Sequence, residues 1–64
     1  MFLGKFLAVY VPQYEEVTVS FENKRVKGTR ISLEEMLHSD VFALNVKSVQ
    51  SIRDGGLWLE VEKP

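Results

Sequence analysis

Four of the eight basic side chains of this 64-residue sequence fall within the eight positions of the stretch NKRVKGTR. They are Lys24, Arg25, Lys27 and Arg30. Four phosphate contacts would give a salt slope of roughly −3 to −4 through counterion release. The run contains no interleaved aromatic residue of the kind that stacks on single strands. The sequence therefore favours a charged, solvated turn that keeps a sheet edge from aggregating, with a nucleic-acid contact as the alternative.

Residue types that support catalysis or metal binding are scarce. There is no cysteine, and His38 is the single histidine, so neither a thiolate site nor an imidazole-rich metal site is expected. Nucleophilic catalysis needs a Ser, Cys or Thr beside an oriented base, and the sequence offers no such set. The paired glutamates fit exposed positions. We therefore expect a protein that is not an enzyme, with no catalytic residue, cofactor or metal; an enzyme built at an oligomer interface is a distant third hypothesis.

Length and composition indicate one small globular domain over residues 1–64. Apolar residues make up 45% of the chain and the net charge is −1, so no global field attracts nucleic acid or membrane. The apolar run at residues 6–11 is too short for a signal peptide or a membrane span. The lack of cysteine fits a reducing compartment. These features predict a cytoplasmic protein without a membrane partner.

Residues 2–11 are rich in aromatic and β-branched side chains and precede Pro12, which predicts a strand. The short link at residues 12–15 predicts an antiparallel hairpin with a second strand at 16–22. Both faces of the first strand would be apolar, and one would carry Phe2, Phe6 and Tyr10. A single short helix cannot cover both faces. A homodimer contact would bury the second face, or else a coiled sheet or small barrel would cover it with its own loops.

The middle of the chain predicts a helix from residue 33 to about 38. Ser32 and Glu35 have the spacing of a capping box. The helix either continues past Asp40 or stops, with Asp40 capping a second turn. Before it, residues 22–25 are predicted to form a turn. The sequence does not decide whether residues 26–31 form a third strand.

The end of the chain predicts a hairpin of residues 46–53 and 57–62 around Asp54-Gly55-Gly56. The irregular spacing of apolar residues in its first strand indicates a bulge or a late strand start. In the last strand Leu57, Leu59 and Val61 point inward and Trp58 points outward. Packing against a neighbouring side chain of the same sheet, such as a lysine or arginine stem, is the favoured explanation for Trp58, and a binding interface is the alternative.

Together these elements predict an α+β fold: a small, mainly antiparallel sheet in the order β-β-(β)-α-β-β, with one short helix. An SH3-like or OB-like barrel is the structural alternative. The architecture resembles that of short β-rich accessory proteins, including those of phages and mobile elements. This likeness rests on no motif, so no functional residue can be assigned from it. The functional hypothesis is a non-enzymatic, homo-oligomeric protein-interaction or accessory module. Its candidate interface is Phe2, Phe6, Tyr10 and Trp58; the alternative is a nucleic-acid-binding protein that uses residues 24–30.

Overall fold

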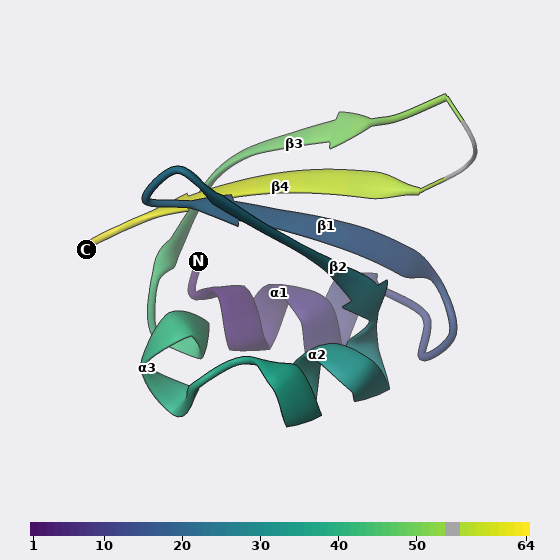
Figure 1. Ribbon diagram of the computed structural model, residues 1–64, viewed down its shortest axis with the longest axis horizontal. Coiled ribbons are helices and arrows are strands. Elements are labelled where there is room, and N and C mark those ends of the chain that lie inside the picture. The colour runs from purple at the N-terminus through teal and green to yellow at the C-terminus, as the bar shows by residue number, and fades with distance from the viewer. Residues whose placement is uncertain (54–55) are drawn as a thin grey trace.

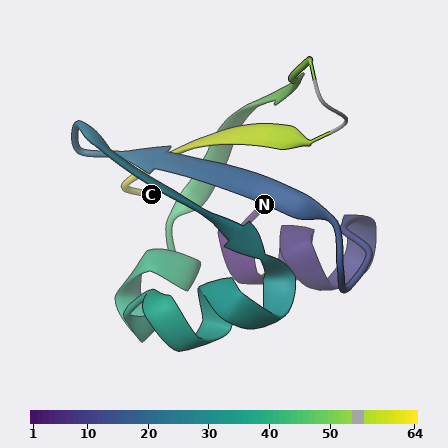
Figure 2. The same cartoon turned by 45° about the vertical axis from the view of Figure 1, so that its right-hand side comes forward.

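In residues 1–53 and 56–64, which the computed structural model describes, four strands form one sheet and three short helices lie together on one of its faces (Figure 1). The elements are α1 (Leu3–Tyr10), β1 (Glu16–Phe21), β2 (Lys24–Thr29), α2 (Arg30–Met36), α3 (Ser39–Phe42), β3 (Asn45–Ser51) and β4 (Leu57–Glu62). The turned view in Figure 2 shows the same two layers. The predicted α+β class is confirmed, although the described residues contain more than one helix.

The sheet has the strand order β2-β1-β4-β3. The pairs β1–β2 and β3–β4 are antiparallel, whereas β1 and β4 pair in parallel at the centre, with Val19 beside Leu59. Two hairpins are thus joined side by side, and the predicted mainly antiparallel sheet is confirmed. Because the sheet stays open between β2 and β3, the SH3-like or OB-like barrel is not formed.

The predicted strand at residues 2–11 is wrong, because Leu3–Tyr10 form the helix α1. The predicted hairpin between residues 2–11 and 16–22 is wrong for the same reason. Leu3, Leu7 and Val11 are spaced by four residues, so one helical face can bury all three. This burial outweighs the β-propensity of the aromatic and β-branched residues, which is a weak and context-dependent preference.

The end of α1 explains the role of Pro12 in a different way. Val11 is the C-terminal cap, with extended φ and ψ of −111° and 117°, and its amide still donates to the Leu7 carbonyl at 3.2 Å. Proline disfavours the helical conformation in the residue before it and commonly follows a helix cap. Pro12 therefore ends a helix here, where it was predicted to end a strand.

Hydrogen bonds and close packing fix the N-terminal half of α1. The Leu3 amide donates to the Leu44 carbonyl at 2.8 Å, and the Val46 amide donates to the Met1 carbonyl at 2.9 Å. At Gly4 the helix passes close to α3, where an added Cβ would lie 3.3 Å from the Phe42 Cβ. A segment far away in the sequence therefore holds α1 against the sheet.

The hairpin of β1 and β2 turns at Glu22 and Asn23. Both residues have positive φ, 48° and 65°, as a two-residue turn with the twist of a β-hairpin requires. The predicted turn at residues 22–25 is therefore confirmed in its first half. The third strand, left open at 26–31, exists but covers Lys24–Thr29.

The predicted capping box at Ser32 and Glu35 is wrong, because the helix starts earlier. Thr29 is the N-cap of α2, and its Oγ1 accepts a hydrogen bond from the Ser32 amide at 3.3 Å. The helix ends at Met36, and a separate turn, α3, begins after His38. His38 caps α3 through its Nδ1, which accepts from the Asp40 amide at 3.5 Å, so the helix does not continue unbroken through Asp40 and Asp40 is not the cap.

Thr29→Ala should lower the free energy of unfolding by about 1 kcal/mol, the usual cost of losing an N-cap side chain. Glu35→Ala is the matched control and should change stability by less than about 0.5 kcal/mol, because Glu35 is exposed and Thr29 is the N-cap in this structure. Urea denaturation of both variants measures the difference. A larger loss of stability for the Glu35 variant than for Thr29→Ala would contradict the Thr29 cap and support the predicted capping box at Ser32 and Glu35.

The hairpin of β3 and β4 agrees with its prediction. The strands pair from Asn45–Glu62 to Ser51–Leu57, with a register shift between Val46 and Ser48 where a bulge was expected. The predicted turn at Asp54-Gly55-Gly56 lies partly outside the described residues, since residues 54 and 55 are not among them.

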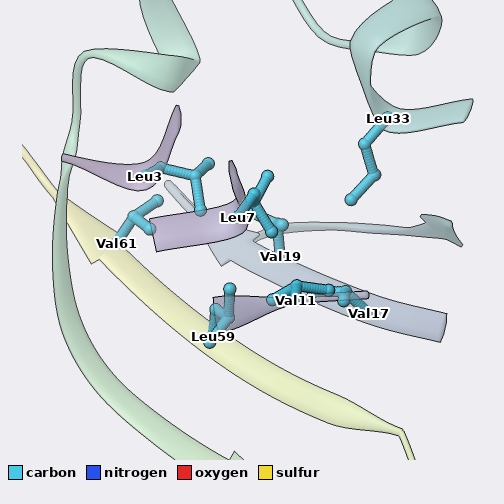
Figure 3. Packing of buried hydrophobic residues seen from close by; sticks show 8 residues of the cluster. All are labelled: Leu3, Leu7, Val11, Val17, Val19, Leu33, Leu59 and Val61. Atoms are coloured by element: carbon cyan, nitrogen blue, oxygen red, sulfur yellow. The ribbon is translucent and has the colours of Figure 1, made fainter. Parts of the chain in front are cut away.

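The core lies between the sheet and the helices (Figure 3). Its buried side chains come from α1, α2 and the two central strands. They are Leu3, Leu7, Val11, Val17, Val19, Leu33, Leu59 and Val61. Figure 3 shows Leu3 and Leu7 of α1 directed at the valines and leucine of β1 and β4. This small core leaves large parts of the apolar surface outside it.

Candidate interaction surface

Three of the four predicted interface residues lie on one side of α1. Phe2, Phe6 and Tyr10 are spaced by four residues, which aligns them along a helix. Phe2 is 53% exposed and Tyr10 is 59% exposed, while Phe6 is half-buried at the core margin. The rings of Phe6 and Tyr10 lie 5.2 Å apart with their planes tilted by 44°. The aromatic row is therefore ordered and largely open to solvent.

Helical geometry adds Val9 to this row. At about 100° per residue, Val9 lies about 20° from Phe2 around the helix and about 160° from Leu7, on the side of α1 turned away from the buried face; it is 59% exposed. We call Phe2, Phe6, Val9 and Tyr10 the α1 flank. A helix that is apolar around most of its circumference is normally buried on all sides. In α1 only the side that contains Leu3 and Leu7 is buried.

More apolar side chains are exposed in the same layer. Met1 is exposed directly before the flank. Val49 pairs with the buried Leu59 and so faces the helix side of the sheet, yet it is half-exposed, because the helix layer does not cover this part of the edge strand β3. The helix side of the domain is thus incompletely covered.

Trp58, the fourth predicted interface residue, lies on the opposite face of the sheet. Leu59 and Val61 are buried on the helix side, so the alternation along β4 directs Trp58 outward, as predicted. The Arg25 guanidinium lies over the indole, 5.1 Å from the ring centroid. This contact reaches across β1 and agrees with the expected packing against a lysine or arginine, although the guanidinium and not the aliphatic stem lies over the ring. Trp58 therefore does not share a surface with the α1 flank.

The side chains of the basic stretch make separate contacts with different parts of the chain. Lys27 forms an ion pair with Glu16 at 2.9 Å, and Arg25 packs on Trp58. Arg30 points into the helix layer, where its Nη1 donates to the carbonyls of Leu7, Ala8 and Val11 at 3.3–3.4 Å. Lys24 is exposed at the start of β2. Three of the four side chains thus contact other elements, and no single basic surface gathers all four.

Two surface hollows among the described residues are each smaller than the several hundred Å³ of a usual ligand site. One of about 50 Å³ lies on the helix-free face beside Thr18 and Lys27. The other, of about 210 Å³, lies between Phe21 and Val41, with Glu22, Asp40 and Lys63 at its rim. Within residues 1–53 and 56–64, no three His, Asp or Glu side chains group closely enough to hold a metal ion. In the same ranges, no helix has the length and apolarity that crossing a membrane requires.

Comparison with protein-family models, with curated proteins and with solved structures found no match to this chain.

Sequence reasoning missed two features of this surface. In the predicted strand at residues 2–11, Val9 would lie on the face opposite Phe2, Phe6 and Tyr10, whereas the helix brings it beside them. Arg30 was grouped with the exposed basic residues, whereas it holds the end of α1. The four-residue spacing of Leu3, Leu7 and Val11 was the signal that could have revealed the first. No signal in the sequence identifies the second, because its partners are backbone carbonyls about twenty residues away.

Proposed function

We propose that this protein is a non-enzymatic protein-interaction module that binds a partner protein through the α1 flank. The observation that supports this most strongly is the exposed aromatic row on α1, with Phe2 and Tyr10 more than half open to solvent.

The exposed aromatic area gives the size of the hydrophobic stabilisation that binding would provide. An aromatic side chain can bury 150–250 Å², so the exposed parts of Phe2 and Tyr10 together offer about 200 Å². At about 25 cal/mol per Å², covering this area is worth about 5 kcal/mol before the costs of association. The isolated chain lacks this hydrophobic stabilisation, whereas a complex that covers the two rings would gain it.

The chemistry of the α1 flank also fits a protein contact. Interface cores are enriched in aromatic residues and methionine and depleted in charged residues, and the flank with Met1 has this composition. The row is ordered before binding, because α1 is packed on the core and the Phe6 and Tyr10 rings already touch. Little conformational entropy remains to be lost on binding, which favours affinity.

Photocrosslinking from single sites tests the proposal. A photoreactive phenylalanine analogue is placed at Tyr10 in cells that make the protein, and crosslinked products are separated by mass. Tyr14 is the matched control, because it is an aromatic residue with 79% exposure that lies in the loop after α1. We expect a discrete protein adduct from position 10 and none from position 14. Equal labelling from both positions, or none from either, would contradict a specific contact at the α1 flank.

A further inference from the structure

We infer that the occupant of the α1 flank is a second copy of this chain, held by antiparallel packing of two α1 helices around Phe6. This inference rests on the proposed function and names its partner.

The spacing of the aromatic residues is symmetric. At 1.5 Å rise per residue, Phe2 and Tyr10 each lie about 6 Å from Phe6 along the helix axis, in opposite directions. A two-fold axis beside Phe6 therefore places Phe2 against Tyr10 of the partner subunit, and Phe6 against Phe6 of the partner subunit. A two-fold contact requires such self-complementarity, in which residue i meets j and j meets i. A contact with an unrelated surface would not require the row to be symmetric.

Charge does not oppose this arrangement. Lys5 is the charged residue within α1, and it is exposed. It lies about 100° around the helix from Phe6, so it stays at the rim of the paired helices and in water. The two-fold pairing thus keeps the two Lys5 ammonium groups out of the centre of the contact and does not bring them face to face.

The available area predicts a weak dimer. With Met1 and Val9 added to the two aromatic residues, the exposed apolar surface is roughly 300–400 Å² per subunit. Two such surfaces bury less than the roughly 1,200 Å² at which stable complexes begin. We therefore expect a dissociation constant in the micromolar range or weaker, and a monomer–dimer equilibrium that depends on concentration.

Sedimentation equilibrium of the 64-residue chain, from about 5 μM to about 1 mM, tests the inference. The mean mass should rise from the monomer towards twice the monomer. Phe2→Lys and Tyr10→Glu, measured separately, should each weaken the dimer at least about tenfold, because each removes an aromatic ring from the contact and leaves a charge that must lose water to be buried there. Tyr14→Glu should leave the dissociation constant unchanged. Circular dichroism checks that each variant keeps the wild-type helix content.

Mixing the two variants tests the antiparallel geometry. In a mixed dimer the introduced lysine meets the introduced glutamate, while the remaining Phe2 and Tyr10 keep their original contact. The mixture should therefore associate at least about tenfold more tightly than either variant alone. A parallel pair would set position 2 against position 2, so the mixture would gain no charge pair.

The outcomes separate this inference from the proposed function. A wild-type chain that stays monomeric to about 1 mM overturns the self-association, and so does a dimer that Phe2→Lys does not weaken. A mixture that gains nothing overturns the antiparallel geometry. If the chain is monomeric but Tyr10 still crosslinks to a different protein, the proposed function stands with another partner. If Tyr10 crosslinks to nothing, both fail.

Discussion

Leu7→Ala should lower the free energy of unfolding by about 3 kcal/mol, within the range known for emptying a buried leucine site. Val9→Ala should change it by less than about 0.5 kcal/mol, as surface substitutions do. Leu7 is 1% exposed and packs in the core, whereas Val9 lies in solvent on the α1 flank. A chain of 64 residues has roughly 3–10 kcal/mol of stability in total. The first change should therefore unfold a measurable fraction of the protein.

This pair of variants distinguishes a helix from a strand. Residues two apart lie on the same face of a strand, so a strand at residues 2–11 would expose or bury Leu7 and Val9 together. In α1 they lie on opposite sides. Urea titration followed by the fluorescence of Trp58, the single tryptophan, gives both free energies. Similar losses for the two variants would contradict the helix.

Arg30→Met should lower the free energy of unfolding by about 2 kcal/mol, since hydrogen bonds that involve a charged group each contribute about 1.5–3 kcal/mol and the three here are long. Its Nη1 donates to the Leu7, Ala8 and Val11 carbonyls at the end of α1. A helix leaves its last carbonyls without intrahelical partners, and a cation there also interacts favourably with the helix dipole. Methionine keeps much of the side-chain volume but donates nothing.

Lys24→Met is the matched control for Arg30→Met. Lys24 belongs to the same basic stretch and is exposed at the start of β2, so its stability effect should stay below about 0.5 kcal/mol. Thermal and urea unfolding of both variants measures the contrast. If Arg30 were an exposed phosphate contact, both variants would be equally stable. That result would contradict the structural role assigned to Arg30.

The second half of the fold could be predicted because its signals are local. The alternation along β4 fixed which side chains of Leu57–Glu62 point inward, and the Asp-Gly turn signal predicted its pairing with β3. In β1, Val17 and Val19 face the core, and Thr18 between them is buried as well. The parallel pairing of β1 with β4 joins strands about forty residues apart, and no local pattern in either strand specifies its neighbour.

The error at residues 2–11 arose from a segment that is apolar in every direction. Such a segment satisfies a doubly covered strand and an all-apolar helix equally well. Propensity favoured the strand, and the burial of Leu3, Leu7 and Val11 on one face decided for the helix. At the start of α2, Ser32 and Thr29 were both suitable caps, and the extended backbone of Thr29 decided between them.

Three of the four candidate interface residues lie on one side of α1 despite this error, for a geometric reason. Phe2, Phe6 and Tyr10 are four residues apart, and four is both an even number and close to one helical turn. They share a face in a strand and in a helix alike. Val9 is separated from Tyr10 by an odd step, so the strand assigned it to the wrong side. Trp58 could not be excluded from the same surface, because the sheet that separates it from α1 is a property of the tertiary fold.

The central claim is that residues 3–10 form a helix whose aromatic flank is left uncovered by the domain. Nuclear magnetic resonance of the isotope-labelled chain, at a concentration where it is monomeric, tests this most directly. We expect helical Cα shifts across Leu3–Tyr10, contacts from Leu3 and Leu7 to Val19 and Val61, and strong broadening of Tyr10 and Val9 by a soluble paramagnetic probe. Extended Cα shifts, with cross-strand contacts from residues 2–11 to 16–22, would contradict it.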